Sequence, residues 1–425
     1  MNYTRRELLS QSIQAGAAFT ALSHGRILGA NDKIRVGAIG VGNRCRYLLR
    51  LLNGLPANQL VAMSDVYAPR RDFPAEVRPY AEYRQLLEQK DIDAVCIATV
   101  DHWHTQCSID AMNTGKHVYV EKPMTRYLGE AFAIYDTVKK TGKKLQVGSQ
   151  GCSDAKWHKA AELIRAGKLG TLVLGQSSYM RNNAKGEWNY DIKPWCTPDD
   201  VNWKAWLGPV HKKIDFSADH YFRWRKYYPY CAGLLGDLLP HRLHPFMLAT
   251  GDPQFPTRVC CIGTKAVHTD RNTPGTPERD VAESIQLLAE FPSGLTLVMA
   301  SASINEQGFR DMIQGHKASL NMSGNRVQLT PERPFVDEID PALFDGIEPG
   351  EAIHHHEKNW FDCIRSGKEP NANIDLAIRV QTVISLAEVS ERLKITALFD
   401  EKTRKITDGS GREIKPLDYG WTDLS

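Results

Sequence analysis

The sequence lacks the features that bind nucleic acid or cross a membrane. Its 425 residues carry 53 Lys plus Arg against 50 Asp plus Glu, a net charge of +3, and the basic residues do not gather into one stripe. The longest unbroken apolar runs are strand-length, such as Ala94 to Ala98, and a membrane span needs roughly 20 residues. We therefore predict neither a nucleic-acid partner nor a membrane span.

Cysteine is also sparse and irregularly spaced. The nine cysteines are an odd number, and they show neither the CxxC spacing of a zinc site nor the density of a disulfide scaffold. We predict that most of them are reduced residues of the core.

The composition is that of an ordinary globular protein, with 42% hydrophobic and 24% charged residues. The chain is long enough for two or three domains. We predict a signal segment at 1–30, an NAD-binding domain at 31–150 and a substrate and oligomerisation domain at 151–425. The fold class expected is α/β.

The N-terminus has the pattern of a twin-arginine export signal. Arg5 and Arg6 precede a weakly apolar run from Ala15 to Leu22, and small residues end the segment at Gly29 and Ala30. This predicts a periplasmic or otherwise exported protein. The twin-arginine route carries folded proteins, which agrees with reduced cysteines. An amphipathic N-terminal helix of a cytoplasmic protein is the alternative, and the sequence leaves cleavage of the segment open.

A strand, a glycine turn and a helix follow one another from residue 34. The apolar strand is Ile34–Ile39, the turn contains Gly40 and Gly42, and an apolar helix runs through Tyr47–Leu52. Gly40 permits the tight turn, and Gly42 lets the backbone approach a pyrophosphate at the positive end of the helix. Cys45 replaces the third glycine, and its small side chain still allows close packing. We expect a dinucleotide-binding turn.

An acidic residue stands where the ribose of NAD requires one. Asp65 ends the next strand, Gln59–Ser64, 23 residues after Gly42. Its carboxylate can accept both ribose hydroxyls and would repel the 2′-phosphate of NADP. We therefore predict NAD rather than NADP. Arg70 and Arg71 follow and are either solvated loop charges or groups that reach a 2′-phosphate.

Further strand and helix units complete a doubly wound parallel sheet. Strands are expected at Asp93–Thr99, His117–Val120 and Lys144–Val147, with helices at Thr105–Thr114 and Gly129–Thr141. Ligands bind beyond the carboxyl ends of such strands. The residues expected to contact the nucleotide are Gly40, Gly42, Asn43, Arg44, Asp65, Thr99, His102, His104, Glu121 and Lys122.

The motif Glu121-Lys122-Pro123, together with Gly40-Val41-Gly42, resembles the Gfo/Idh/MocA family of glucose-fructose oxidoreductase and inositol dehydrogenase. The resemblance extends from Lys33 to about Leu393. It implies an N-terminal Rossmann domain and a C-terminal α/β domain with a large, mostly antiparallel open sheet. In this family the sheet often forms the oligomer interface, so we expect a homodimer or homotetramer. The pattern of the second half agrees, because Ser284–Phe291 and Leu295–Ser301 predict a hairpin.

The resemblance also implies the catalytic residues. The family's DxxxH motif is matched by Asp237 and His241, and the lysine of its EKP motif is Lys122. A spacing of four places the carboxylate and imidazole on one face of a helical turn, where Asp237 can orient His241. The alternative is that Asp237 caps a helix and His241 is a core histidine.

Two other features have two interpretations each. Aromatic residues crowd Trp188–Tyr230, either as a carbohydrate surface or as packing between domains. Within or near that segment we expect substrate contacts from Tyr221, Arg223, Arg225 and His244. The run His354-His355-His356-Glu357 suggests a metal site, but consecutive histidines point in different directions. We predict one inward histidine and no metal.

Together with these patterns, the resemblance implies an NAD-dependent oxidoreductase that transfers hydride between a sugar, polyol or glycoside hydroxyl and nicotinamide. An exported enzyme has no pool of free cofactor to draw on, so we expect tightly bound NAD. Two other functions remain open: a redox-neutral glycosidase that works by oxidation, elimination and reduction, and a non-catalytic carbohydrate or nucleotide sensor.

Overall fold

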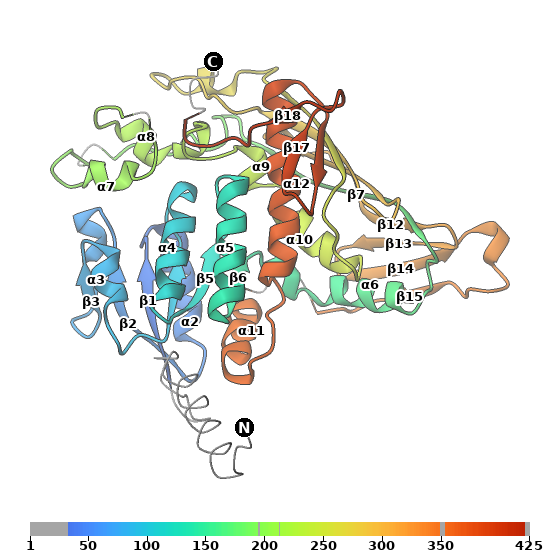
Figure 1. Cartoon of the computed structure of the whole chain (residues 1–425), viewed down its shortest axis with the longest axis horizontal. Helices are drawn as coiled ribbons and strands as arrows, with labels where there is room; N and C mark the ends of the chain where they lie inside the picture. Colours follow the sequence, from blue (N-terminus) through green and yellow to red (C-terminus); the bar gives the residue numbers. More distant parts are fainter. Residues whose placement is uncertain (1–32, 194–195, 212, 349–352, 421–425) are drawn as a thin grey trace, which may run out of the picture.

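The computed structural model describes residues 33–193, 196–211, 213–348 and 353–420. The predicted signal at 1–30 lies outside the described residues. Two β-sheets lie beside each other, the N-terminal sheet in blue to teal and the second sheet in green to red (Figure 1).

All six strands of the N-terminal sheet are parallel, in the order β3-β2-β1-β4-β5-β6. They are β1 (Ile34–Ile39), β2 (Asn58–Ser64), β3 (Arg78–Tyr80), β4 (Ala94–Ile97), β5 (His117–Glu121) and β6 (Leu145–Gly148). The strand order reverses between β1 and β4, which opens a crevice at their carboxyl ends. The predicted doubly wound sheet is confirmed.

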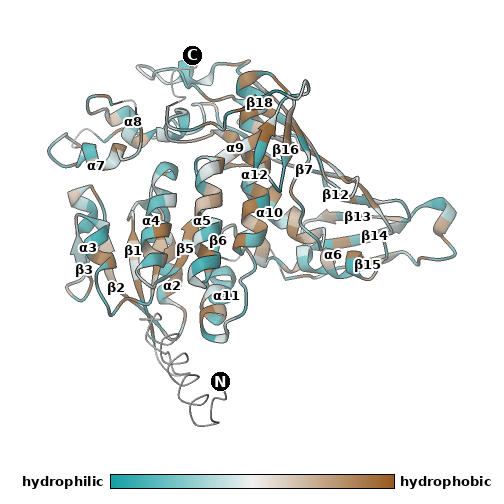
Figure 2. Ribbon diagram, viewed as in Figure 1, coloured by the Kyte–Doolittle hydropathy of each residue, from teal (hydrophilic) through white to brown (hydrophobic). Residues whose placement is uncertain are grey.

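Helices cover both faces of this sheet because its strands are apolar on both faces. One face packs on α4 (Asp101–Asn113) and α5 (Leu128–Thr141), and α3 (Tyr83–Leu87) contacts α4. The other face packs on α2 (Asn43–Asn53) and α11 (Ile353–Ser366). Figure 2 shows the apolar strands in brown between these helices.

The start of α4 differs from the sequence prediction. A helix from Thr105 was expected, whereas α4 begins at Asp101 with Val100 as its N-cap. The negative charge of Asp101 in the first turn complements the positive end of the helix. As a result, residues 101 to 104 belong to the helix rather than to the loop before it.

The second sheet contains twelve strands and is mostly antiparallel, as predicted. Its order is β15-β14-β13-β12-β7-β10-β9-β8-β16-β17-β18, with β11 paired to β7, and only the β7–β10 pair is parallel. The strands are β7 (Leu172–Asn182), β8 (Arg258–Thr264), β9 (Ser284–Glu290), β10 (Thr296–Ala302), β11 (Ile304–Asn305), β12 (Asp311–Gly315), β13 (Ala318–Ser323), β14 (Arg326–Pro331), β15 (Ala342–Phe344), β16 (Ala397–Asp400), β17 (Lys405–Thr407) and β18 (Glu413–Ile414). The hairpin predicted around residues 292–294 is β9–β10.

Helices cover one face of this sheet. They are α6 (Ala155–Arg165), α10 (Pro240–Ala249) and α12 (Ile374–Leu393), which contact β14, β7 and β8 respectively. On the opposite face, Ile262 and Leu288 are 61% and 50% exposed. This sheet therefore has an open apolar face in the single chain.

Segments of the second half return to the N-terminal sheet. Helix α11 contacts α2, and α12 contacts α5. The short helices α7 (Trp203–Leu207) and α8 (Ala218–Phe222) lie over the carboxyl edge of the N-terminal sheet (Figure 1). The domain boundaries proposed from the sequence stay predictions. No helix among the described residues is both long and apolar enough to span a membrane.

Candidate active site

The first part of the site is the turn between β1 and α2. Gly40 has φ +79°, and a Cβ at this position would lie 2.7 Å from the backbone of Thr99. Gly42 is the N-cap of α2, where no side chain caps the helix and no acidic residue occupies the first turn. The free backbone N–H groups in the first turn of α2 can therefore bind a pyrophosphate. Cys45, in place of the third glycine, is fully buried, and Asn43 is exposed.

Asp65 lies next to this turn at the end of β2. Its Oδ2 accepts a 2.7 Å hydrogen bond from the backbone N–H of Val41, and its Oδ1 accepts one of 2.9 Å from Tyr67. An ionised carboxylate has about four acceptor sites, so it retains capacity for ribose hydroxyls. Arg70 Nη1 lies 3.8 Å from Oδ2. The residues thus fit a dinucleotide, with a cation beside the ribose-binding acid.

Arg44 joins the nucleotide turn to the end of β5. Its Nε donates a 2.7 Å hydrogen bond to Oε1 of Glu121, which is 5% exposed. Burial opposes the positive charge, but the attraction of Glu121 outweighs it and the pKa of Arg44 is raised. This hydrogen bond fixes the nucleotide-binding turn relative to Lys122, the residue that follows Glu121.

The two predicted histidine contacts lie in the first turn of α4. His102 is 1% exposed, and its Nε2 donates a 2.8 Å hydrogen bond to the carbonyl of Trp206. Burial lowers the pKa of His102 to about 3, so its ring is neutral. The ring nitrogens of His104 lie 2.7 Å from the carbonyl oxygen of Pro123 and 3.3 Å from that of Thr99. These contacts hold the strand ends together, and the nucleotide contacts of both histidines stay predictions.

The structure brings the predicted catalytic residues together around Asp237, the last residue of α9 (Leu234–Asp237). Lys122 Nζ donates hydrogen bonds of 2.6 Å to both Oδ1 and the main-chain oxygen of Asp237. Arg225, in η3 (Trp224–Lys226), donates to Oδ1 at 3.0 Å. Trp188 donates to Oδ2 at 2.9 Å. One carboxylate thus has three side-chain donors, two of them cationic.

Charge compensation fixes the protonation state of Asp237. Burial favours the neutral acid, but Lys122 and Arg225 outweigh it and hold the pKa of Asp237 well below its usual value. Asp101, 3% exposed nearby, has its pKa raised by burial despite His104 and Arg225. The pKa values of these two neighbouring carboxylic acids are therefore shifted in opposite directions, which is common at catalytic centres.

His241 lies one residue inside α10, across a break from Asp237. Its ring stacks on Tyr179 of β7 with a centroid distance of 5.1 Å. Burial and then the charge of Lys122 lower the pKa of His241 well below the usual histidine value. A neutral imidazole near the ammonium group of Lys122 can accept a proton from a hydroxyl group. The single helical turn expected for this motif is instead divided between α9 and α10.

A family model described as an oxidoreductase family with an NAD-binding Rossmann fold matches residues 34–149. Residues 34–149 belong to the Gfo/Idh/MocA oxidoreductase family. This range contains the nucleotide turn, Asp65 and Lys122. The resemblance predicted from Glu121-Lys122-Pro123 is confirmed.

Curated relatives of this chain are named as glycosidases. A "Glycosyl hydrolase family 109 protein" of Saccharopolyspora erythraea is 27% identical over 259 residues, which cover 51% of this chain and 56% of that protein. An "Alpha-N-acetylgalactosaminidase" of Shewanella oneidensis is 29% identical over 215 residues, with coverages of 45% and 46%. The chain thus spans about half the length of these relatives.

Solved structures of low sequence identity share the fold. An aldose-aldose oxidoreductase from Caulobacter crescentus, complexed with glycerol, has a TM-score of 0.63 and 19% identity, with 86% of this chain and 100% of that chain covered. A levoglucosan dehydrogenase, in complex with NADH and levoglucosan, has a TM-score of 0.63 and 16% identity, with coverages of 85% and 98%. These similarities show that the whole two-sheet fold occurs in other proteins.

Trp188 is the site residue that sequence reasoning did not single out. It is 1% exposed and has φ +66°, a conformation that bulky residues rarely adopt. Strain of this kind persists where the surroundings fix it, often at functional sites. No sequence motif marks it, and its presence in the aromatic segment was the only signal.

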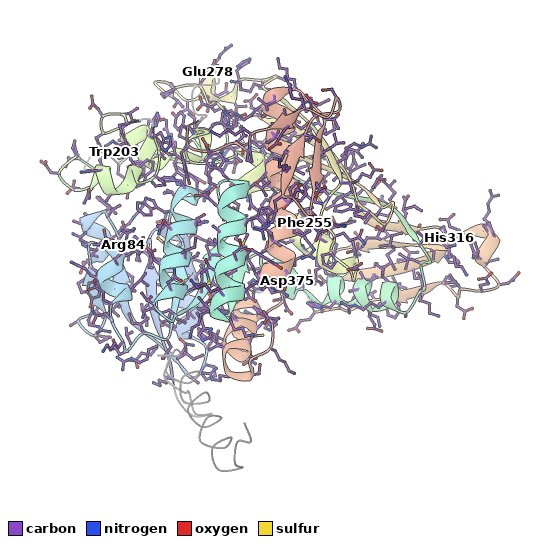
Figure 3. All side chains as sticks on the ribbon, in the orientation of Figure 1. Arg84, Trp203, Phe255, Glu278, His316 and Asp375 are labelled. Atoms are coloured by element: carbon purple, nitrogen blue, oxygen red, sulfur yellow. The ribbon has the colours of Figure 1, made fainter. Side chains whose placement is uncertain are left out.

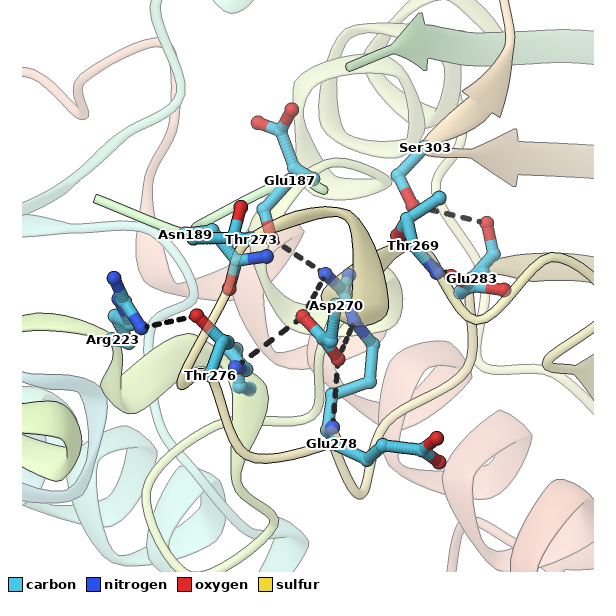
Figure 4. A network of polar contacts seen from close by, with 12 residues as sticks. Glu187, Asn189, Arg223, Thr269, Asp270, Thr273, Thr276, Glu278, Glu283 and Ser303 are labelled. Atoms are coloured by element: carbon cyan, nitrogen blue, oxygen red, sulfur yellow. Dashed lines mark hydrogen bonds and ion pairs between the residues drawn. The ribbon is translucent and has the colours of Figure 1, made fainter. Parts of the chain in front are cut away.

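A buried ionic network supports the Trp188 loop from behind. Figure 4 shows Asp270 at its centre. Arg279 donates to both carboxylate oxygens of Asp270 and, at 2.8 Å, to the carbonyl of Glu187. The guanidinium of Arg279 also lies 5.6 Å from the centre of the Trp188 ring. This network positions the indole that holds Asp237.

The predicted substrate contacts separate into two groups. Arg225 belongs to the Asp237 cluster. Arg223 is 7% exposed and donates to Asp219, to Thr276 and to the carbonyl of Tyr190, a structural role visible in part in Figure 4. His244 is 1% exposed, and burial lowers its pKa to about 3. Tyr221 is also buried, next to Tyr67 on the nucleotide side. Their substrate contacts stay predictions.

The histidine run at the start of α11 has one inward member, as expected. His356 is fully buried and makes hydrogen bonds with Ser153 at 2.7 Å and with the carbonyl of Val147 at 2.9 Å. Burial lowers its pKa to about 4. Among the described residues, no group of three or more His, Cys, Asp or Glu side chains is arranged to hold a metal ion.

Proposed function

We propose that this protein transfers hydride between a sugar or polyol hydroxyl and an NAD that stays bound. The observation that supports this most strongly is the cluster of Lys122, Asp237, Arg225 and His241 at the carboxyl edge of an NAD-binding sheet. A substrate hydroxyl in this crevice meets a neutral base and two cations.

Each residue of this cluster has a separate role in the oxidation of an alcohol. His241 takes the hydroxyl proton, since its lowered pKa keeps the imidazole neutral. Lys122 and Arg225 stabilise the negative charge that develops on the substrate oxygen. Asp237 holds both cations in place and balances their charge. When bound, NAD supplies the hydride acceptor.

NAD is the cofactor that the ribose site favours. Asp65 is ready to accept ribose hydroxyls, while Arg70 is close enough to offer a 2′-phosphate some compensation. We infer a preference for NAD over NADP. Titration of the nucleotide-free protein with each cofactor tests it, and tighter binding of NADP would contradict it.

Export is part of the same proposal. The twin-arginine pattern at the N-terminus favours an exported protein, and an exported enzyme needs a cofactor that is restored within each cycle. The hydride removed from one substrate is then returned to the same molecule or to a second sugar.

Glycoside cleavage is the second candidate, favoured by the curated glycosidase relatives. Oxidation of a ring hydroxyl to a ketone makes the proton on the neighbouring carbon acidic. Loss of that proton expels the glycosidic oxygen from the next carbon, water adds to the resulting double bond, and return of the hydride restores the alcohol. Such a cycle consumes no cofactor, and its balance is that of hydrolysis.

The test uses the dialysed full-length protein without added cofactor. Sugars that reduce bound NAD, seen by the absorbance of NADH, support hydride transfer. Release of nitrophenol from a nitrophenyl glycoside, together with bound NAD, supports the second candidate. The variant Lys122→Ala should lower either rate about 100- to 10,000-fold, whereas Lys139→Ala, at an exposed ion pair with Asp375, should not. The sensor hypothesis instead predicts no rate on any tested sugar, with no change in Lys122→Ala or His241→Ala.

A further inference from the structure

Residues 196–211 and 213–222 lie over the nucleotide site, and we name these two stretches the cover. The aromatic residues of the cover were candidates for carbohydrate contacts. The structure instead packs Tyr221, which is 5% exposed, against Tyr67 in the loop after β2, and Trp206, which is 4% exposed, against His102 of α4. Figure 3 labels Trp203 in α7, above the carboxyl edge of that sheet.

The cover is joined first to the loop after β2. Val201 forms an antiparallel bridge with Tyr67, and backbone hydrogen bonds of 3.0 Å connect Asn202 to Val66 and Ala68 to Asp200. This loop directly follows Asp65, so the cover is attached beside the adenosine ribose position.

The second attachment is to the start of α4, across the crevice from the first. The carbonyl oxygen of Trp206 accepts hydrogen bonds from Nε2 of His102 at 2.8 Å and from Nε1 of Trp103 at 2.9 Å. Gly208, with φ +49°, lies so close to Trp103 that a Cβ would be 2.3 Å from its ring. The cover thus connects the loops after β2 and β4, which border the adenosine half of the crevice.

Arg70 connects the cover to the phosphate-binding turn. Its guanidinium lies 5.6 Å from the ring centre of Tyr67 and 5.4 Å from that of Tyr221, a cover residue. A Cβ at Gly42 would lie 3.6 Å from Arg70 Nη1. Among the described residues, the side chain of Arg70 donates no hydrogen bond, although its Nη1 lies 3.8 Å from Oδ2 of Asp65. Its donors are therefore available for a phosphate oxygen beside Gly42.

We propose that the cover retains the dinucleotide, and that Arg70 couples it to the pyrophosphate. This inference rests on the proposed NAD-dependent function and adds the reason why the cofactor stays bound. Release of the dinucleotide requires breaking both the Arg70 contact and the attachments of the cover, so dissociation is slow compared with turnover.

Two tryptophan variants form a matched test. Trp103→Phe removes the N–H that binds the cover to α4. Trp203→Phe removes an equivalent bond of 2.8 Å, to the carbonyl of Ile214, that lies within the cover. Both substitutions keep an aromatic ring and remove one indole N–H. They differ only in the hydrogen bond that is lost, either between the cover and α4 or within the cover. NADH bound to each full-length protein is displaced with excess NAD, and the loss of its fluorescence gives the dissociation rate.

We expect Trp103→Phe to release NADH about 2- to 10-fold faster than the unmodified protein, and Trp203→Phe to leave the rate unchanged. Equal rates for the two variants would overturn the proposal. Arg70→Ala should speed release about 10- to 150-fold, because its bond is charge-assisted. The same measurement with NADPH separates the two phosphates: acceleration for both cofactors supports the pyrophosphate contact, and acceleration for NADPH alone overturns it.

The proposed function can fail separately. If the unmodified protein loses NADH rapidly but oxidises sugars with added NAD, retention by the cover is wrong and hydride transfer stands. If NAD is retained and Trp103→Phe releases it faster, but no sugar reacts, the cover stands and the proposed catalysis is wrong.

Discussion

The indole nitrogen of Trp188 donates a 2.9 Å hydrogen bond to Oδ2 of Asp237, while Lys122 and Arg225 both bind Oδ1. The carboxylate is thereby fixed in rotation as well as in position. Because Asp237 in turn holds Lys122, the indole controls where the lysine ammonium group lies in the crevice.

Replacing Trp188 with Phe should impair catalysis more than folding. The substitution keeps an aromatic ring but removes a donor to a buried carboxylate, and such a bond contributes about 1.5–3 kcal/mol. We expect the rate of sugar-dependent NAD reduction to fall about 10- to 150-fold, measured in a single turnover. Trp360→Phe is the matched control, since Trp360 is equally buried and its Nε1 has no hydrogen-bond partner among the described residues. Equal rates in the two variants would contradict this role.

The pH profile should report the lowered pKa of His241. Burial and the charge of Lys122 disfavour the imidazolium, so the ring remains a proton acceptor at pH values where an ordinary histidine is charged. We expect the acidic limb of kcat/KM to lie well below pH 6.5. A limb at or above pH 6.5 would exclude His241 as the base, and His241→Asn should abolish the limb.

Ionisation of the buried Glu357 should lower the free energy of unfolding as the pH rises. Burial raises its pKa to about 8, against a model-compound value of 4.5. Between these two values the folded state keeps the proton that the unfolded state has lost, so the contribution of Glu357 to stability is fully present below pH 4.5 and is lost as the pH rises through 8. Glu357→Gln removes the titrating group with little change in shape.

We therefore expect Glu357→Gln to raise the melting temperature by several degrees at pH 8.5, with the difference shrinking as the pH is lowered to 5. Thermal denaturation at both pH values measures this difference in melting temperature. Each protein at pH 5 is the control for the same protein at pH 8.5. A stabilisation independent of pH would show that the carboxyl group does not titrate as stated.

The open face of the second sheet should mediate self-association. Leu288 and Ile262 expose half or more of their side chains on this face, and apolar patches of this kind mark interfaces. Leu288→Asp should shift the protein toward monomer in light scattering. Val267→Asp, at a loop residue that is 56% exposed, should not. A monomeric unmodified protein would contradict the predicted homodimer or homotetramer.

Much of the nucleotide half could be predicted from the sequence. Apolar runs alternating with amphipathic segments define β1, β2, β4, β5 and β6, because buried parallel strands are apolar on both faces. The edge strand β3 was missed, since three residues, Arg78–Tyr80, give too short a pattern. The first turn of α4 was missed because Asp101, His102 and His104 are polar residues that become buried only through contacts with distant segments.

The sequence by itself determined the nucleotide turn, the strand that ends in Asp65 and the motif that contains Lys122, since each depends on neighbouring residues and on backbone conformation. Only the tertiary structure decided that Trp188, Arg225 and Lys122 meet at Asp237, and that Tyr221 packs beside Tyr67 on the nucleotide side. These contacts join residues that are far apart along the chain. Local periodicity carries no information about them, because they form only when the two halves of the chain pack together and exclude water.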